Sequence, residues 1–332
     1  MRPAAADQAA VAAIAQYEGA DRTQRLTEGA KREGSLTLYT SLTVEDMAAL
    51  NSVFEKKYGV KVKMWRAGAD KVLQRAVTEA RGGRFDVDVL EASTPALESL
   101  FRENLLAPVK SPYQAELMAD AVPAHRSWVG SRLNVFVHAY NTDLVKKAEL
   151  PKTYQDLLHP RWKGKLGIES ADEDWFASVV NGLGEEAGLK LFRNLAAGNG
   201  ISVRKGHTLL TKMVASGDVP FALTVYNFTA EQLKQKGAPM DWYVMPPAVA
   251  RANGVGLARS APHPHAALLY YDFMISEEGQ RILADRDFLP TNKKFDSPFK
   301  GIPLKLVDPA LMLDESDKWT RLYDEIFVKQ SK

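Results

Sequence analysis

The strongest constraint on the fold is a repeated alternation of strand patterns and helix patterns. Residues 35–41 (SLTLYTS), 60–65 (VKVKMW) and 85–93 (FDVDVLEAS) are short apolar or alternating runs typical of strands. Between them, 44–59 and 70–83 carry apolar residues at helical spacing and end at glycines. Successive strand–helix units of this kind predict a parallel sheet with helices on both faces.

A second set of the same kind follows a long β-rich stretch at 128–142. It comprises strand patterns at 163–170, 200–206 and 219–227 and helix patterns at 174–196 and 207–217. A helical segment at about 7–32 precedes the first set, and extended runs (240–248, 254–261) and helices (264–275, 278–285) follow the second. Two α/β sets joined by long extended segments predict two lobes with crossover strands.

Composition excludes several classes of protein. The 332 residues include 43 basic and 41 acidic ones, a formal net charge of +2, so there is no electrostatic case for nucleic acid or an anionic membrane. The absence of cysteine excludes disulfides and thiolate metal sites. No run approaches the roughly 18 apolar residues that span a bilayer. The N-terminal stretch lacks the apolar core of a signal peptide, so we expect either a cytosolic protein or one from which a signal has been removed.

Polar side chains gather where the predicted strands end. Ligands of open parallel sheets bind outside these carboxyl ends, where helices begin. The predicted ligand-binding residues are Thr40, Ser41, Arg66 and Ser93 in the first set and Glu169, Ser170, Asp172, Arg204, Tyr226 and Asn227 in the second. For a bound metal, Tyr226, Glu169, Asp172 and Asp174 are the expected ligands.

Each of these residues also has a purely structural interpretation. Serine and threonine after a strand are commonly helix caps, and the acidic run at 171–175 complements a helix N-terminus. Arg66 lies beside Trp65, and its planar guanidinium suits a carboxylate or phosphate. Signatures of catalysis are poor: there is no H-E-x-x-H pair, nucleophile elbow, P-loop or dinucleotide fingerprint. We therefore expect a binding protein without a cofactor and not an enzyme, with an enzyme on a two-domain α/β scaffold as the lesser alternative.

The sequence resembles the extracellular solute-binding proteins of bacterial ABC importers, in their iron(III)-binding branch. The resemblance runs in order over about 30–295 and rests on these segments: GSLTLYTSLT, FDVDVLEASTPALESLFRENLLAP, LPKTYQDLLHPRWKGKLGI, TLLTKMVASGDVPFALTVYN and PHPHAALLYYDFMISEEGQRILAD.

The resemblance implies a type II periplasmic-binding-protein fold. Each lobe is then a mixed, mainly parallel sheet flanked by helices, and the lobes close on a ligand. The expected parts are a helical extension (1–33), lobe 1 (34–127 plus about 243–295), lobe 2 (128–242) and a C-terminal tail (296–332). The implied protein is periplasmic and monomeric, and it delivers a small-molecule ligand to an ABC permease of the inner membrane.

The ferric-binding members carry adjacent tyrosines after the strand that corresponds to 219–225. Those positions fall on Asn227 and Phe228, with Tyr226 one residue earlier. This departure favours a small organic anion, a zwitterion or a phosphorylated compound as ligand. A ferric ion or ferric chelate is the alternative.

Overall fold

The computed structural model describes residues 8–299 and 301–330, and the chain divides into two compact units. Unit 1 comprises Met1–Leu133 and Ala252–Ser297, and unit 2 comprises Asn134–Arg251 and Pro298–Lys332. The chain passes from the first to the second within strand β5 (Trp128–Asn141) and returns within strand β10 (Ala248–Ala258). Residues 1–7 of the expected N-terminal extension and residues 300 and 331–332 of the expected tail lie outside the described part.

Unit 1 follows the predicted alternation. Its helices are α1 (Gln8–Ala15), α2 (Arg22–Glu33), α3 (Val44–Tyr58), α4 (Ala69–Arg81), α5 (Thr94–Arg102), α10 (Pro264–Ile275) and α11 (Glu277–Ala284), with short 3₁₀ helices at Pro112–Glu116 and Ala119–Ala121. Its strands, besides parts of β5 and β10, are β1 (Ser35–Thr40), β2 (Lys61–Arg66), β3 (Val89–Ser93), β4 (Leu106–Ala107) and β11 (Leu289–Pro290).

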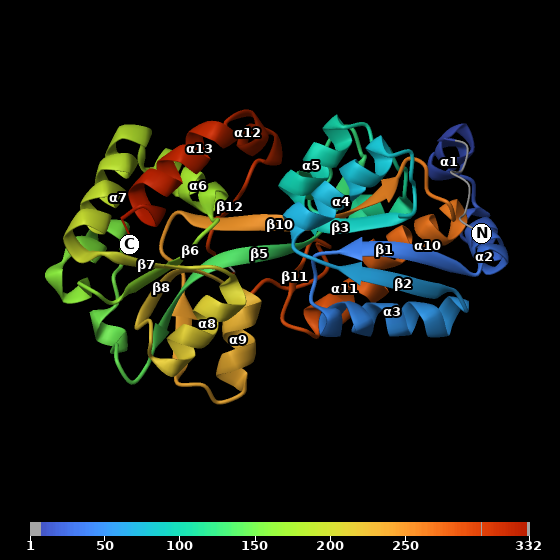
Figure 1. Ribbon diagram of the computed structural model, residues 1–332. Helices are drawn as coiled ribbons and strands as arrows, with labels where there is room; N and C mark the ends of the chain where they lie inside the picture. The colour runs from blue at the N-terminus through green and yellow to red at the C-terminus, as the bar shows by residue number, and fades with distance from the viewer. Residues whose placement is uncertain (1–7, 300, 331–332) are drawn as a thin grey trace. The chain divides into compact units, whose positions relative to one another are not determined.

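The unit 1 sheet places three strand ends side by side. Strand β1 pairs in parallel with β2 and β3, and Thr40 is level with Arg66 on one side and Glu91 on the other. Strand β10 runs antiparallel to β3. Helices α4 and α5 lie together on one face of this sheet, and α3 lies with α11 on the other (Figure 1).

Unit 2 contains β6 (Leu166–Glu169), β7 (Ile201–Arg204), β8 (Phe221–Tyr226), β9 (Met240–Tyr243) and β12 (Leu304–Leu306) besides its parts of β5 and β10. Its helices are α6 (Glu173–Leu183), α7 (Glu185–Asn199), α8 (His207–Ser216), α9 (Asn227–Gln235), α12 (Pro309–Asp314) and α13 (Ser316–Tyr323), with short 3₁₀ helices at Lys147–Glu149, Tyr154–Leu158 and Pro160–Trp162 and a π-helical turn at Asp324–Val328.

The unit 2 sheet is also mixed. Strands β7 and β8 flank β6 in parallel, whereas β5 runs antiparallel to β8 and β9. Helices α8 and α9 cover one face, and α6, α7 and α13 cover the other (Figure 1). A core of aromatic and aliphatic side chains, among them Trp175, Phe176, Phe192 and Trp319, fills the space under α6 and α7.

Two helical predictions need correction. The predicted helix at 174–196 is two helices, because Gly184 has a left-handed φ of +86° and ends α6. Gly188 then allows α7 to approach α6 closely, since a Cβ atom there would lie 2.8 Å from the Cα of Val180. The N-terminal helical segment is likewise two helices, α1 and α2, separated by residues 16–21.

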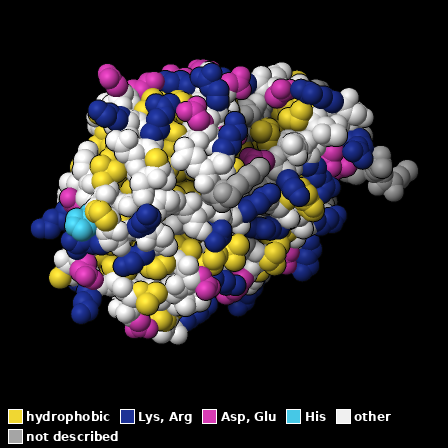
Figure 2. Space-filling view, turned by 60° about the vertical axis from the view of Figure 1, so that its left-hand side comes forward, with side chains coloured by type: hydrophobic (Ala, Val, Ile, Leu, Met, Phe, Trp, Pro, Cys, Tyr) yellow, Lys and Arg dark blue, Asp and Glu magenta, His cyan; other side chains and the backbone are white. Residues whose placement is uncertain are grey.

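Basic side chains are interspersed with acidic and apolar ones over the face that Figure 2 shows. Among the described residues, no helix combines the length and the apolar character needed to cross a bilayer.

Candidate functional site

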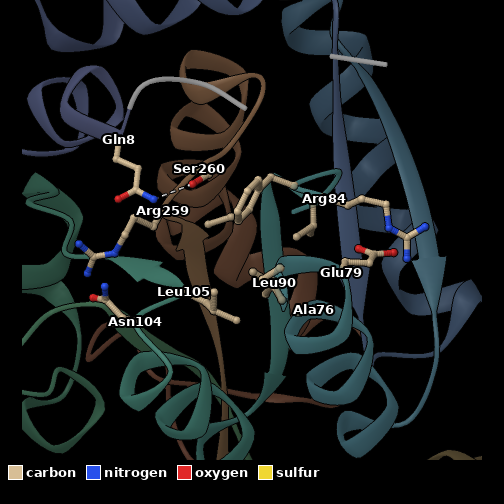
Figure 3. Close-up of a pocket in the computed structure, with 13 residues that line it drawn as sticks. Gln8, Ala76, Glu79, Arg84, Leu90, Asn104, Leu105, Arg259 and Ser260 are labelled. Atoms are coloured by element: carbon tan, nitrogen blue, oxygen red, sulfur yellow. Dashed lines mark hydrogen bonds between the residues drawn. The ribbon is translucent and has the colours of Figure 1, made fainter. Parts of the chain in front are cut away.

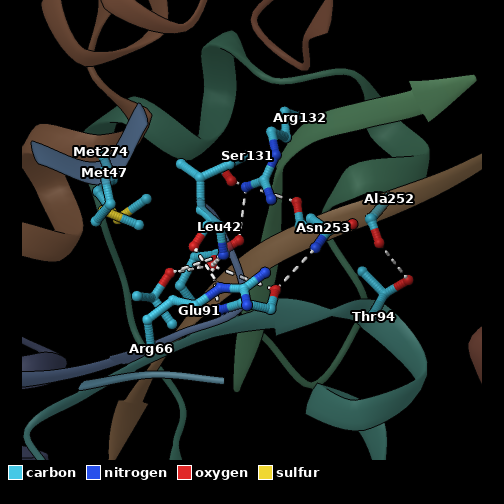
Figure 4. A network of polar contacts seen from close by, with 12 residues as sticks. Leu42, Met47, Arg66, Glu91, Thr94, Ser131, Arg132, Ala252, Asn253 and Met274 are labelled. Carbon is cyan, nitrogen blue, oxygen red and sulfur yellow. Dashed lines mark hydrogen bonds and ion pairs between the residues drawn. The ribbon is translucent and has the colours of Figure 1, made fainter. Parts of the chain in front are cut away.

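A buried carboxylate organises the strand ends of unit 1. Glu91, in β3, is fully buried, and its side chain accepts hydrogen bonds from the Thr40 hydroxyl (2.5 Å) and from the backbone N–H groups of Ser41 and Leu42 (3.0 Å each). Its other oxygen pairs with the Arg132 guanidinium at 2.6 Å (Figure 4). The loop after β1 is therefore fixed by a side chain from β3.

The charge on Glu91 is maintained by its neighbours. Burial by itself raises the pKa of the Glu91 carboxyl. The Arg132 charge and the hydrogen bonds from Thr40, Arg132 and Leu42 outweigh this effect, so that the pKa lies below its usual value. Glu91 is thus an ionised, structural carboxylate at neutral pH.

The predicted residues of unit 1 gather around this network to different degrees. Thr40 is fully buried and bonds Glu91, whereas the Ser41 hydroxyl accepts a hydrogen bond from the Asn253 amide at 3.3 Å. Arg66 is exposed, and its Nε donates to the carbonyl of Leu42 at 3.3 Å. Ser93 is the N-cap residue of α5 and makes no side-chain capping bond. Ser41, Arg66 and Ser93 are therefore the predicted residues of unit 1 that are not fully buried.

In unit 2, three side chains from three different elements converge. Glu169 ends β6, Asp172 is the N-cap residue of α6, and His207 begins α8. One ligand atom from each side chain lies within 4.8 Å of the other two. Among the described residues (8–299 and 301–330), these three form the group of His, Asp and Glu side chains that could hold a metal ion. We call it the 169–172–207 cluster.

The Glu169 carboxylate is held mainly by backbone donors. It accepts from the N–H groups of Gly206 (2.8 Å) and Ala171 (2.5 Å) and from the Ser170 hydroxyl (3.2 Å). Because the carboxyl ends of parallel strands meet at one edge, the loops after β6 and β7 are joined through this single side chain.

Asp172 is fully buried and faces a histidine and an arginine. His207 Nε2 lies 3.0 Å from its carboxylate, and Arg251 lies 3.9 Å away and pairs with Asp174 at 2.9 Å. Burial raises the pKa of Asp172, but His207 and Arg251 outweigh it and lower the pKa overall. For Asp174, burial prevails over Arg251 and the pKa is raised. Asp172 is therefore the carboxylate that the structure keeps ionised.

Aromatic rings form the border of the cluster. The Tyr226 ring stacks on His207 with ring centres 3.9 Å apart, and the Phe228 ring stacks on Tyr226 with ring centres 5.8 Å apart. The Arg251 guanidinium lies over Phe136 (5.3 Å) and Tyr226 (5.6 Å). This stacking holds the His207 imidazole ring in the orientation in which its Nε2 atom faces Asp172.

The remaining predicted residues of unit 2 have other partners. Asn227 is buried, and its side-chain oxygen accepts a hydrogen bond from the Val135 N–H at 3.0 Å. Arg204 is half-buried and donates to the carbonyl of Val203 at 3.0 Å. Glu169, Ser170, Asp172 and Tyr226 are brought together, whereas Asn227 serves the backbone.

Several important residues were not among the predicted ones. His207 had a local signal, because it follows the glycine that ends the loop after β7. Arg251 and Arg132 lie inside the long strands β10 and β5, where no local pattern marks a site residue. Glu91 lies near the end of the strand predicted at 85–93 but was not chosen as a ligand-binding residue.

A separate pocket in unit 1 contains none of the predicted residues. Its floor is apolar, with Leu90 and Leu105 among the lining, and Arg84 and Arg259 lie at its rim (Figure 3). Gln8 of α1 bonds Ser260 across one side at 3.0 Å. The pocket lies against α1 and α4, away from the strand-end network.

Comparison with known proteins decides the family. The family model described as "Bacterial extracellular solute-binding protein" matches residues 87–312, which is more than half of the chain. The chain belongs to this family. The "Major ferric iron-binding protein" of Neisseria meningitidis serogroup B is 27% identical over 322 residues, covering 92% of this chain and 96% of that protein. The "Iron uptake protein A1" of Synechocystis sp. is 28% identical over 298 residues, covering 82% and 81%.

Solved structures agree with this assignment. Iron-bound HitA from Pseudomonas aeruginosa superposes with a TM-score of 0.77 at 27% identity, over 88% of this chain and 99% of that one. The periplasmic binding protein AfuA from Actinobacillus pleuropneumoniae, with fructose-6-phosphate bound, has a TM-score of 0.77 at 21% identity, over 89% and 99%, and shows the fold alone.

The comparisons confirm the predicted fold class and, of the functional prediction, the substrate-binding role in an ABC importer; the names of the two curated relatives above mention iron and not the predicted organic anion. The solute-binding protein has the α/β fold of type II periplasmic binding proteins. It is the substrate-binding component of an ABC-type import system, and its relatives are transport proteins rather than enzymes. Its partners are accordingly a small ligand and an ABC permease.

Proposed function

We propose that this solute-binding protein carries ferric iron, bound as a chelate with a carboxylate-bearing anion. The observation that carries the proposal is the 169–172–207 cluster, in which two carboxylates and one imidazole offer ligand atoms within 4.8 Å of one another. Oxygen-rich sites suit hard cations, and imidazole also suits iron. Relatives over most of the chain are named for ferric iron and iron uptake.

The charge of the cluster supports a cationic centre. Asp172 has a lowered pKa, and the Glu169 carboxylate accepts two backbone N–H bonds. Arg251 supplies a compensating positive charge, largely shared with Asp174. Two carboxylates then face one imidazole, an arrangement that attracts a multivalent cation.

The geometry supports a chelate over a bare ion. Phenolate ligands at the positions suggested by the resemblance are absent, because Phe228 has no donor atom and the Asn227 oxygen is taken by Val135. Three protein ligands leave coordination positions open, and a small chelating anion fills such positions. Arg251, whose Nε is buried without a hydrogen-bond partner, offers that anion a donor beside the cluster.

The same scaffold supports a second candidate, an organic anion, zwitterion or phosphorylated compound without metal. It is favoured by Asn227 and Phe228. The resemblance places these two residues where ferric-binding proteins have tyrosines. Arg251 in unit 2, which pairs with Asp174, is the guanidinium group beside the cluster that we propose for contact with such an anion. For either ligand we propose a monomer in the periplasm that passes its cargo to the permease.

A thermal-unfolding panel distinguishes the two ligands. Protein stripped by partial unfolding and refolding is tested with ferric citrate, citrate alone, phosphate esters, dicarboxylates and amino acids. A ligand at about a hundred times its Kd stabilises by ~2.7 kcal/mol, a shift of a few degrees. Ferric iron as cargo predicts a shift with ferric citrate that citrate alone does not give.

Two histidine variants make the experiment specific to the cluster. His207→Gln removes one proposed ligand atom and should abolish the ferric citrate shift. His159→Gln is the matched control, because His159 is an exposed histidine of the same unit, and it should keep the full shift. A shift by phosphate esters or dicarboxylates alone would reject iron in favour of the second candidate.

A further inference from the structure

The C-terminal helices of unit 2 pack directly behind the cluster. Helix α13 and the π-helical turn after it begin beyond residue 312, where the family match ends. Their aromatic side chains surround Phe176 of α6, with ring centres 5.9 Å away for Trp319, 5.7 Å for Tyr323 and 5.4 Å for Phe327. Tyr323 and Phe327 are almost fully buried. This packing anchors the first turns of α6, whose N-cap residue is Asp172.

The Tyr323 hydroxyl contacts the turn that carries both carboxylates. It donates a hydrogen bond to the main-chain carbonyl of Glu169. Glu169 lies at the beginning of the turn 169–172, which ends at Asp172, the N-cap residue of α6.

Few other partners are available to this turn. The Ser170 N–H donates to the carbonyl of Arg204 in the neighbouring strand, and the Glu169 N–H donates to the Thr224 hydroxyl oxygen. The Glu169 carbonyl instead receives the phenol. A buried carbonyl without a donor is unfavourable, so the turn would shift if the hydroxyl were removed.

Tyr323 remains a hydrogen-bond donor across the ordinary pH range. Burial, and then the nearby carboxylates of Asp172, Glu169 and Glu173, raise the pKa of the phenol well above its usual value. The phenol therefore keeps its proton and donates a hydrogen bond to the Glu169 carbonyl.

We propose that Tyr323 is a positioning residue, which holds the turn 169–172 so that the carboxylates of Glu169 and Asp172 converge with His207 on the ligand. The inference rests on the proposed function of the cluster. Residues that orient ligands from behind commonly change metal affinity by ten- to a hundredfold when they are replaced. The segment beyond residue 312 is then part of the binding apparatus of this protein.

The test compares two tyrosine-to-phenylalanine variants of the full chain. Tyr323→Phe removes the hydroxyl and keeps the ring within its aromatic cluster. Tyr243→Phe is the matched control, since the Tyr243 hydroxyl also donates to a main-chain carbonyl of unit 2, that of Pro151 at 2.8 Å. We expect Tyr323→Phe to weaken ferric citrate binding at least tenfold in calorimetry, and Tyr243→Phe to leave it unchanged.

A second measurement needs no ligand. Hydrogen exchange of peptides covering 169–175 and 204–208 reports the Asp172 N–H and the Ala171 and Gly206 N–H groups that hold the Glu169 carboxylate. Tyr323→Phe should accelerate exchange in both peptides, whereas Tyr243→Phe should not. Unchanged exchange in Tyr323→Phe would overturn the positioning role, whatever the wild-type protein binds.

The two measurements separate the two hypotheses. If the wild-type protein does not bind ferric citrate, the proposed cargo is wrong, and the exchange result still decides whether Tyr323 holds the turn. If exchange accelerates while ferric citrate affinity stays within twofold, the turn is held by Tyr323 but its position does not serve the ligand, and the inference is rejected.

Discussion

Replacement of Arg132 by methionine removes the positive charge that faces Glu91 in the core of unit 1. The two side chains are 3% and 0% exposed and lie 2.6 Å apart. Breaking a buried ion pair by removal of one partner costs about 3–5 kcal/mol, because the remaining charge is left uncompensated. We therefore expect Arg132→Met to lower the free energy of unfolding by about this amount at pH 7.

The loss should depend on pH in a defined direction. In the wild type the pKa of Glu91 is lowered, so its stabilising contribution is present above the pKa of the unfolded chain and disappears as the pH falls through the folded-state pKa. In Arg132→Met, burial is no longer opposed by the guanidinium, and the pKa of Glu91 rises. The difference between the two proteins should therefore shrink as the solution is acidified.

Urea unfolding at pH 7 and pH 5 measures both effects. With a slope of ~3 kcal/mol per molar, a loss of about 3–5 kcal/mol lowers the midpoint by roughly 1–1.7 M. Arg66→Met is the control, because Arg66 is exposed and bonds the same network through Leu42; it should change stability by less than about 0.5 kcal/mol. Adding Glu91→Gln to Arg132→Met should recover part of the loss. Equal effects of the two arginine variants, or a loss independent of pH, would refute the reasoning.

Three further predictions concern packing, ionisation and capping. Gly29→Ala should lower the free energy of unfolding by about 1–3 kcal/mol, because the added Cβ would lie 2.3 Å from the His265 ring. Gly198→Ala, with open space around the added Cβ, should not lower it, and equal melting temperatures of the two variants would contradict this. Burial raises the pKa of Glu173 to about 7, so the folded state loses stability as the pH rises from about 4.5 to 7. Glu173→Gln should therefore have a higher melting temperature than the wild type at pH 8 and the same melting temperature at pH 4. Different melting temperatures at pH 4 would contradict this reasoning. Thr43→Ala removes the α3 N-cap bond and should cost about 1 kcal/mol in chemical unfolding; no loss would mean that the cap is dispensable.

Local signals explain which parts of the fold were predictable. The α3 helix begins after Thr43 and ends before Gly59, whose left-handed φ of +72° suits a glycine, and both ends are legible in the sequence. The reversal between α6 and α7 was missed, because the apolar spacing continues through Gly184. It depends on the close approach of Gly188 to Val180, a contact that hydrophobic periodicity does not encode.

The residues of the candidate site also fall into those that local sequence predicts and those that it does not. Glu169 and Asp172 were predictable, because they follow a strand whose end faces a helix start. Arg251 pairs with Asp174 across 77 residues, and Tyr323 bonds Glu169 across 154, so neither could be assigned from neighbouring sequence. Strand ends show where a ligand site can form, but distant elements determine the charge and orientation of its groups.

Asn227 shows how such distant demands bear on the ligand. From its place after β8 the amide is a plausible ligand group, but the Val135 N–H lies buried on β5 and requires an acceptor, which Asn227 supplies. With Asn227 committed to the backbone and Phe228 lacking a donor, the segment after β8 contributes aromatic surface rather than ligand atoms. Among the described residues of unit 2, Glu169, Asp172 and His207 in the loops after β6 and β7 are the group that could hold a metal ion. The scaffold is shared with proteins named for iron, but fold alone does not assign the ligand.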